Sequence, residues 1–341
     1  MKRKDFLKNG LAAGTLMGTA AYATGAQASN LNMERMQPGD GVTHPDDEVI
    51  VERAQSGKPH AGKVLAAIQP HSDDIPIFAG GTVAKLLDEG YTGYLIRTTN
   101  DEKAGRGDTL GQSIENDQID TEKIVQAYGM EKMYDLYYRN HQMDNYAIQE
   151  IKARLIYLFR LLKVDTIVSY DPWGHYEENP DHYVTARAVE AARWMSGNAR
   201  NYPEHFDAGL EPHSVMEQYY FARGPQKVNR VVDISNYIDK KVEVNMLNVT
   251  QGPAGETGSR LRRNLEAQGR RLPILGNSDE EADFNYIKHL MLDKASLQLR
   301  GVLSDKEVGR PYGLEWAERF YYRGPRENAL SAYIEENTER I

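Results

Sequence analysis

The stretch KVLAAIQPHSDDIPIFAGGTVAKLLDEG, residues 63–90, decides the fold of this chain. Its first part, residues 64–68, is a short apolar run whose length suits a buried strand. Its last part, residues 82–89, has helical spacing and stops at Gly90. Between them lies His71-Ser72-Asp73-Asp74, which places an imidazole and two carboxylates where a strand passes into a helix.

The polar residues of this junction predict a ligand site. In an open α/β sheet, ligands bind in the crevice outside the carboxyl ends of the strands. The alternative is a polar turn that ends in a helix cap. We favour the site because the motif and its strand-to-helix context agree.

The following residues alternate between strand and helix patterns. Strands are predicted at 94–98, 133–138 and 165–170, with a polar loop at 100–108 and helices at 114–128 and 148–162. Further along, the pattern predicts strands at 218–221 and 228–234, helices at 237–249 and over most of 278–299, and a loop or lid at 252–276. This alternation indicates βαβ units and an α/β fold with a mainly parallel sheet.

Composition narrows the function. The chain has 341 residues, 40% of them hydrophobic, which is enough for a full core. Its net charge of −9 argues against a nucleic-acid partner. Cysteine is absent, so a metal ion would have to be held by His, Asp or Glu. No Gly-x-Gly-x-x-Gly follows the first strand and no Walker pattern is present, so nucleotide binding is unsupported.

The N-terminal residues 1–28 predict an export signal, so the protein is expected to be periplasmic or secreted. A basic start precedes an apolar run at 11–23 that is too short to span a bilayer, and Ala26-Gln27-Ala28 suits cleavage. The residues Arg3 and Lys4 resemble the twin-arginine signal, with lysine in the second place, which leaves the general secretion route open.

Residues 29–60 are polar and predict a leader or linker, followed by one domain at 61–325 and a tail at 326–341. The leader contains an early motif, His44-Pro45-Asp46-Asp47-Glu48. Its flanking residues predict neither a buried strand nor a helix start, and a metal site needs rigid flanking elements. We therefore interpret this early copy as a solvated loop.

A second polar stretch, residues 171–182, follows the predicted strand 165–170 and ends at the start of a helix. A parallel sheet would bring its His182 to the same edge as His71 and Asp74. Two histidines and one carboxylate form a familiar catalytic zinc set with a fourth position open for water. Alone, His182 would be interpreted as a polar helix-start residue, but beside the first motif the metal interpretation is favoured.

These two motifs resemble those of the PIG-L/LmbE-like family of zinc-dependent N-deacetylases. The first family motif, His-Pro-Asp-Asp-Glu before a Gly-Gly helix start, corresponds to residues 71–75 with Gly80 and Gly81. The second, His-Pro-Asp-His, corresponds to residues 179–182. The resemblance covers roughly residues 62–250, with a weaker echo at 313–320. It implies a Rossmann-like three-layer sandwich, zinc on His71, Asp74 and His182, and Asp73 as general base.

The chain departs from the family pattern at two positions. Ile75 replaces an acid, a change expected to affect the surroundings of the ligands rather than a ligand itself. Asn179 replaces a histidine whose family role is to stabilise the oxyanion or to move a proton. Asparagine donates a hydrogen bond but carries no proton, so His175 and Tyr176 in the same loop are candidates to compensate.

The expected function is that of an exported zinc amidohydrolase that removes the acetyl group from an N-acetylated sugar or glycoconjugate. Two alternatives stay open. One is a zinc amidase acting on another small N-acyl metabolite, and the other is a non-catalytic carbohydrate-binding member of the fold. Only Asn179 favours the non-catalytic alternative. The retained general base Asp73 opposes it, because a binding protein needs no base beside an open metal site.

Overall fold

A computed structural model describes residues 48–103, 105–294, 303–325 and 329–339. The predicted export signal and the early motif at 44–47 lie outside these residues. None of the helices in the described ranges is long and apolar enough to cross a membrane.

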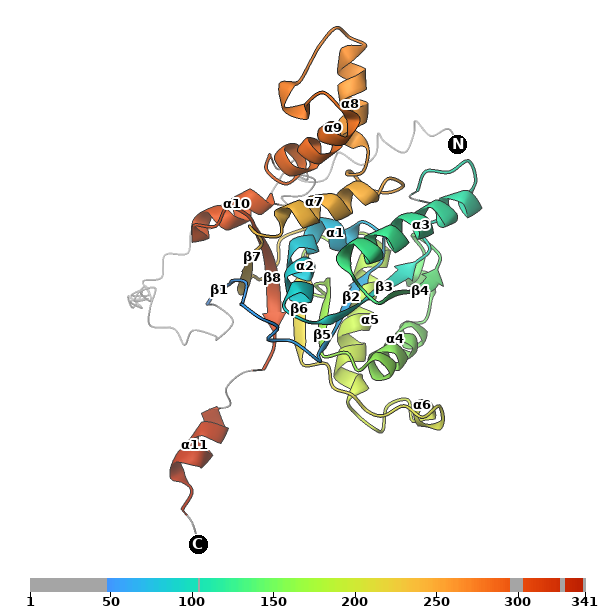
Figure 1. Cartoon of the computed structure of the whole chain (residues 1–341). Coiled ribbons are helices and arrows are strands. Elements are labelled where there is room, and N and C mark those ends of the chain that lie inside the picture. The colour runs from blue at the N-terminus through green and yellow to red at the C-terminus, as the bar shows by residue number, and fades with distance from the viewer. Residues whose placement is uncertain (1–47, 104, 295–302, 326–328, 340–341) are drawn as a thin grey trace, which may run out of the picture. The chain divides into compact units, whose positions relative to one another are not determined.

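The fold is built on one sheet with the strand order β1-β7-β8-β6-β5-β2-β3-β4 (Figure 1). The strands are β1 Ile50–Glu52, β2 Val64–Gln69, β3 Thr92–Thr99, β4 Lys132–Tyr138, β5 Thr166–Tyr170, β6 Glu217–Phe221, β7 Arg230–Asp233 and β8 Ala317–Arg323. β8 runs antiparallel to β6 and β7, and the other pairings are parallel.

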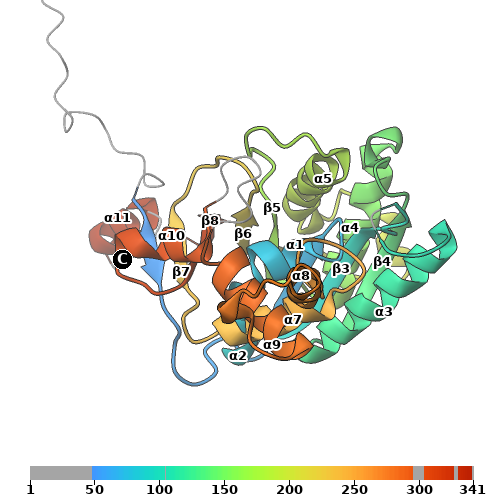
Figure 2. The ribbon, with the colours of Figure 1, turned by 90° about the horizontal axis from the view of Figure 1, so that it is seen from above.

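Helices pack on both faces of this sheet, as Figure 2 shows from above. The helices of the described residues are α1 Asp74–Phe78, α2 Gly80–Asp88, α3 Leu110–Tyr128, α4 Ile148–Leu162, α5 Pro180–Ser196, α6 Glu204–Asp207, α7 Ile238–Leu247, α8 Thr257–Glu266, α9 Asp279–Tyr286, α10 Asp305–Gly309 and α11 Ala329–Asn337, not all of which contact the sheet. Short turns of other helix types are η2 Met143–Asn145, η3 Pro273–Leu275, η4 Ile287–Met291, which is a π-helix, and η5 Arg310–Tyr312.

The central strand β2 shows how the two cores arise. Leu65 and Ala67 belong to a core that α2, α3 and α7 cover, whereas Ala66 and Ile68 belong to a core that α4 and α5 cover. All four residues are fully buried, because alternate residues of a strand point to opposite faces of the sheet. The predicted three-layer α/β fold with a mainly parallel sheet is thereby confirmed.

Two segments differ from their prediction. Ile50–Glu52 was expected to belong to a leader, but it forms β1 and pairs with β7, so the sheet begins before residue 61. A three-residue strand is too short to leave a periodic pattern in the sequence. The 252–276 segment was expected to be a loop or lid, yet α8 occupies Thr257–Glu266 because its arginines and leucines repeat with helical spacing.

A buried ion cluster holds β1 against the rest of the sheet. Lys85, which is fully buried on α2, lies 2.9 Å from both Glu52 and Glu89. Glu52 also lies 2.9 Å from the guanidinium of Arg230 and accepts a hydrogen bond from the Tyr219 hydroxyl. This strand at the start of the domain is therefore fixed by charge pairing rather than by its length.

The variant Lys85→Met tests this cluster. We expect the free energy of unfolding to fall by about 3–5 kcal/mol, because Glu89 would be left as a buried charge without its lysine and Glu52 would keep only Arg230. The control Lys163→Met removes a lysine paired with Glu211 at the surface and should cost less than about 1 kcal/mol. Denaturant unfolding of both variants measures the difference. Equal losses of stability would show that the buried cluster contributes no more than a surface ion pair.

Candidate active site

Three side chains with metal-binding atoms converge at the carboxyl ends of β2 and β5. His71, Asp74 and His182 are buried, and their ligand atoms all lie within 4.8 Å of one another. Nδ1 of His71 lies 3.0 Å from Nε2 of His182. The Asp74 carboxylate lies 3.4 Å from His71 Nδ1 and 3.6 Å from His182 Nε2. The structure thus brings together the three residues predicted as metal ligands.

The other nitrogen of each imidazole faces a carboxylate. Nε2 of His71 lies 3.0 Å from Asp181, and Nδ1 of His182 lies 3.1 Å from Glu177. Glu177 is itself held by Arg223, whose guanidinium donates two hydrogen bonds to it. A carboxylate behind a metal-binding histidine fixes the ring orientation and its tautomer. It also leaves the opposite nitrogen free to bind a metal ion.

This geometry fits a cation between the two rings. When both outer nitrogens donate to carboxylates, Nδ1 of His71 and Nε2 of His182 would point lone pairs at each other across 3.0 Å. Such a contact is favourable only with a proton or a metal ion in it. The two imidazoles and one carboxylate of this site are therefore chemically suited to bind a metal ion.

The protonation of the metal-free site agrees with this reasoning. Burial alone would lower the pKa of His71, but its hydrogen bonds with Asp181 and Asp74 raise it well above the usual value. Burial lowers the pKa of His182, against the opposing charges of Asp74 and Glu177. These opposite shifts favour a proton on His71 rather than on His182, and a bound metal ion would displace it.

Asp74 is the first residue of α1 and is fixed from two directions. Its carboxylate accepts a hydrogen bond from the backbone N–H of His71 at 2.9 Å and one from the Tyr170 hydroxyl at 2.6 Å. Although burial opposes ionisation, the charges of His182 and His71 lower the pKa of Asp74 well below its usual range. The ring of Tyr170 also stacks on His182, with centroids 4.3 Å apart.

Asp181 connects three strand ends. Besides His71, its carboxylate accepts hydrogen bonds from the side chain of Asn140 at 3.0 Å and from the backbone N–H groups of His141 at 2.6 Å and Met143 at 3.2 Å. Because those residues follow β4, this one buried carboxylate ties the loop after β4 to the first turn of α5 and to the loop after β2.

Asp73 occupies the N-cap position of α1 without a side-chain capping bond, and its carboxylate faces Gly252. Burial, reinforced by the charge of Asp74, raises the pKa of Asp73 to about 7. Gly252, at a φ of +82°, approaches this carboxylate so closely that a Cβ there would lie 2.5 Å from the Asp73 oxygen. The glycine is therefore required both by its left-handed backbone and by the space that Asp73 occupies.

The structure places the remaining predicted residues outside the cluster of ligand atoms. Asn179 is the N-cap of α5, and its side-chain oxygen accepts the backbone N–H of Asp181 at 3.0 Å. His175 is exposed and belongs to neither group of metal-capable side chains in the described part of the chain. Ile75 is fully buried in the core beneath α1 and provides no metal-binding atom.

Sequence reasoning missed the residues that support the ligands. Tyr170, Glu177 and Asp181 lay in or beside the quoted motif but received no role. His141, which is exposed and forms a second group of metal-capable side chains with His71 and Asp181, also received no role in the sequence analysis. Its signal was available, because it follows β4 and the carboxyl ends of parallel strands share one edge of the sheet.

An α/β fold with two histidines and one carboxylate at the strand ends is the arrangement of a metal-dependent hydrolase. Residues 66–193 match the sequence profile of the PIG-L family, which is described as GlcNAc-PI de-N-acetylase. A diacetylchitobiose deacetylase from Thermococcus kodakarensis is 27% identical over 198 residues, which make up 56% of this chain and 71% of that protein. The chain therefore contains a PIG-L family domain over residues 66–193 and is similar to deacetylases, which are enzymes that hydrolyse amide C–N bonds.

Solved structures share this fold. An N,N'-diacetylchitobiose deacetylase from Pyrococcus horikoshii superimposes with a TM-score of 0.59 and 21% identity, covering 76% of this chain and 83% of that one. GalB, the 4-carboxy-2-hydroxymuconate hydratase of Pseudomonas putida, superimposes with a TM-score of 0.54 and 15% identity, covering 78% and 98%. Because a hydratase has the same fold, the reaction must be argued from the site and not from the architecture.

The variant Asp181→Asn tests the support of His71. We expect metal affinity to fall about 10- to 100-fold with the fold retained, because the neutral amide holds the imidazole less firmly. Competition with a chromogenic chelator measures the affinity. The matched control is Glu190→Gln on the same helix, whose carboxylate accepts the Trp173 indole and not a ligand. An affinity equal to that of the control would remove Asp181 from the metal site.

Proposed function

We propose that the protein is a zinc-dependent N-deacetylase that removes the acetyl group from an N-acetylated sugar or glycoconjugate. One observation carries this proposal. Two imidazoles are held from behind by Asp181 and Glu177, so their inner nitrogens converge with the Asp74 carboxylate. The family match and a relative named for diacetylchitobiose support the choice of an N-acetylated sugar.

The ligand set supports zinc in particular. Imidazole nitrogens and a carboxylate oxygen suit this ion, and three protein ligands leave a position for water or substrate. When bound, zinc lowers the pKa of a coordinated water toward neutrality and polarises the amide carbonyl. The chain itself supplies the orientation of the ligands, the exclusion of water around them and the transfer of protons.

Asp73 is the proposed general base. A base is most effective when its pKa lies near the working pH, and burial beside Asp74 brings the pKa of Asp73 to about 7. Asp73 accepts the proton of the attacking water as the new C–O bond forms. It then returns a proton to the nitrogen as the amide C–N bond breaks. The products are acetic acid and a free amine, and the acid then gives its remaining proton to the amine, so the final products are acetate and an ammonium group.

The oxyanion of the addition step needs a donor. The side-chain oxygen of Asn179 is engaged by the backbone of Asp181, which leaves its Nδ2 group as the atom that would donate. His175 is the alternative, as an exposed imidazole in the same loop. Both roles stay predictions, as does export through the signal at residues 1–28, which we include in the proposal on its basic start and its small-residue cleavage pattern.

The proposal is tested by acetate release from a panel of N-acetylated sugars and other small N-acyl compounds. We expect release from N-acetylated sugars, loss of activity with a chelator and recovery with zinc. Recovery with other divalent ions, but not with zinc, would change the metal. Sugar binding without any release of acetate would favour the non-catalytic alternative instead, and cleavage of only non-sugar amides would favour the metabolite amidase.

Asp73→Asn and Asp74→Ala separate the base from the ligand. Asp73→Asn should retain metal and lose about 10²–10⁴-fold in turnover, whereas Asp74→Ala should lose both. In the wild type, turnover should decrease as the pH is lowered, because the Asp73 carboxylate becomes protonated and can no longer accept a proton. The midpoint should lie at or below about pH 7, because a bound cation lowers the pKa of Asp73. Loss of metal from Asp73→Asn would make Asp73 a ligand, and unchanged turnover would exclude it from the reaction.

A further inference from the structure

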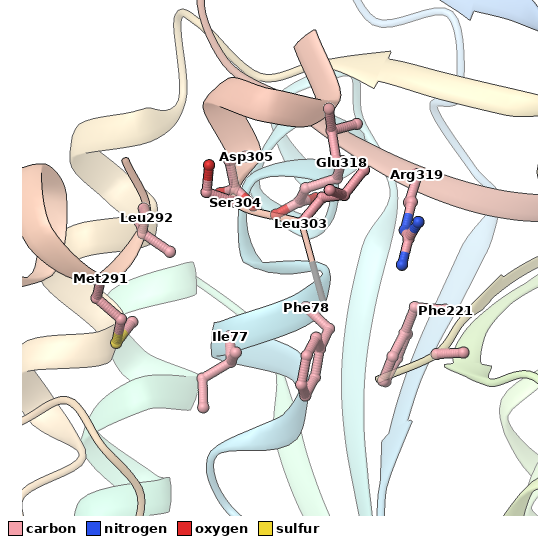
Figure 3. A pocket seen from close by; sticks show the side chains of 12 residues that line it. Ile77, Phe78, Phe221, Met291, Leu292, Leu303, Ser304, Asp305, Glu318 and Arg319 are labelled. Atoms are coloured by element: carbon pink, nitrogen blue, oxygen red, sulfur yellow. The ribbon is translucent and has the colours of Figure 1, made fainter. Parts of the chain in front are cut away.

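A pocket lies between α1, η4 and the start of β8 (Figure 3). Its walls are mainly apolar, with Ile77 and Phe78 from α1, Phe221 at the end of β6, and Met291 from η4. Arg319 of β8 provides a cation. The cavity measures about 30 Å³, which is room for roughly two water-sized groups.

The pocket and the metal site share one edge of the sheet. Tyr170, whose hydroxyl binds Asp74, pairs with Phe221 across β5 and β6. β8 is the next strand beyond β6, and Arg319 lies near its first residue. Two strand spacings of about 4.8 Å thus separate Arg319 from the strand that carries Tyr170, or roughly 10 Å in all.

Direct contacts also link the two places. The ring of Phe221 lies 4.5 Å from that of Tyr170, which stacks on the ligand His182. The single turn of α1 begins with the ligand Asp74 and ends with Phe78 in the wall of the pocket. A substrate whose amide lies at the metal site therefore has this pocket about one sugar ring away.

Arg319 is half-buried and has few hydrogen-bond partners in the described part of the chain. Its only hydrogen bond to a described residue goes to the carbonyl of Gly224 at 3.4 Å, although a guanidinium has five N–H donors. Burial lowers the pKa of Arg319, with no carboxylate to oppose it. By contrast, Arg97 lies against Asp135, Arg223 against Glu177 and Arg230 against Glu52. The fully buried Arg160 has no carboxylate partner, but its guanidinium donates to four backbone carbonyls.

The carboxylates in the pocket wall are already engaged elsewhere. Glu318 accepts the backbone N–H groups of Gly81 and Thr82 at the start of α2 and also binds the fully buried Lys241. Asp305 lies 2.7 Å from the same lysine. In Figure 3 the guanidinium of Arg319 points toward the ring of Phe221 and away from both acids.

We propose that this pocket binds an acidic group of the substrate, so that the deacetylase acts on an N-acetylated sugar joined to an acidic neighbour such as a uronic acid. This inference rests on the proposed function and deepens it. The planar guanidinium of Arg319 matches a carboxylate, and the apolar wall strengthens the contact by excluding water. The partly buried ring of Phe78 provides apolar surface for the neighbouring sugar.

Calorimetric binding to the metal-free full chain tests this subsite without turnover. The probes are two disaccharides that differ only at C6 of the second ring, N-acetylglucosaminyl-glucuronate and N-acetylglucosaminyl-glucose. We expect the wild type to bind the acidic disaccharide roughly 10- to 100-fold more tightly, the range for a charge-assisted hydrogen bond. Arg319→Met should remove this preference and leave binding of the neutral disaccharide unchanged. The control Arg323→Met, an exposed arginine of the same strand, should keep it.

Three results would overturn the subsite. They are equal affinities in the wild type, equal losses for both disaccharides in Arg319→Met, and a lost preference in the Arg323→Met control. If Arg319→Met does not fold, Arg319→Lys replaces it and should retain only part of the preference, since an ammonium cannot bind a carboxylate in a planar fork. If the wild type prefers the acidic disaccharide but the metal-loaded enzyme releases no acetate, the subsite is supported and only the deacetylase function is refuted.

Discussion

The site depends on the pairing of each imidazole with a carboxylate behind it. Without Asp181 and Glu177, the rings of His71 and His182 could rotate or change tautomer, and their inner nitrogens would not converge. Each carboxylate also has its own anchors, so the orientation is passed from the strands to the rings. Glu177 is held by Arg223, which follows β6. Although burial raises the pKa of Glu177, its hydrogen bonds with His182 and with that guanidinium lower it to about 2. The acids thus stay ionised over the whole range in which an enzyme would work.

Holding so many charges at the edge of a sheet requires compensation within the fold. Buried cations lie where elements distant in sequence meet: Lys85 joins α2 to β1, Lys241 joins α7 to β8, and Arg97 joins β3 to β4. Each is fully buried, and each contacts at least two acceptors, so no charge in these clusters is left alone. A buried ion pair is weak evidence of stability, but breaking one is costly, and these clusters therefore specify which elements lie together. Arg319 stands apart from this pattern, which is why we assign it to a ligand.

The sequence allowed prediction of much of the sheet and of the convergence of His71, Asp74 and His182, because strand patterns and strand-end motifs are visible within short stretches of the chain. Alternating patterns mark β2 to β5, and His71, Asp74 and His182 follow strand ends at which polar residues gather. The supporting acids could not be assigned in this way. Glu177 and Asp181 are polar residues in a polar loop. Only the folded chain, which brings the start of α5 beside the loops after β2 and β4, shows which imidazole each one faces. β1 and β8 escaped prediction for a similar reason, since a short edge strand and an antiparallel insertion depend on partners far away in the chain.

Asn179 shows how one position can serve the fold and the reaction in competition. Asparagine is among the best N-cap residues, and here its side-chain oxygen satisfies a backbone N–H in the first turn of α5. That turn carries both Asp181 and His182. The cap therefore stabilises the backbone that positions the His182 imidazole and the carboxylate that holds His71. A histidine at this position, as in the motif that the chain resembles, could carry a proton but is a poorer cap. The exchange therefore favours rigidity of the candidate metal site over proton transfer from position 179, which is consistent with our proposal that Asp73 both takes and returns the proton.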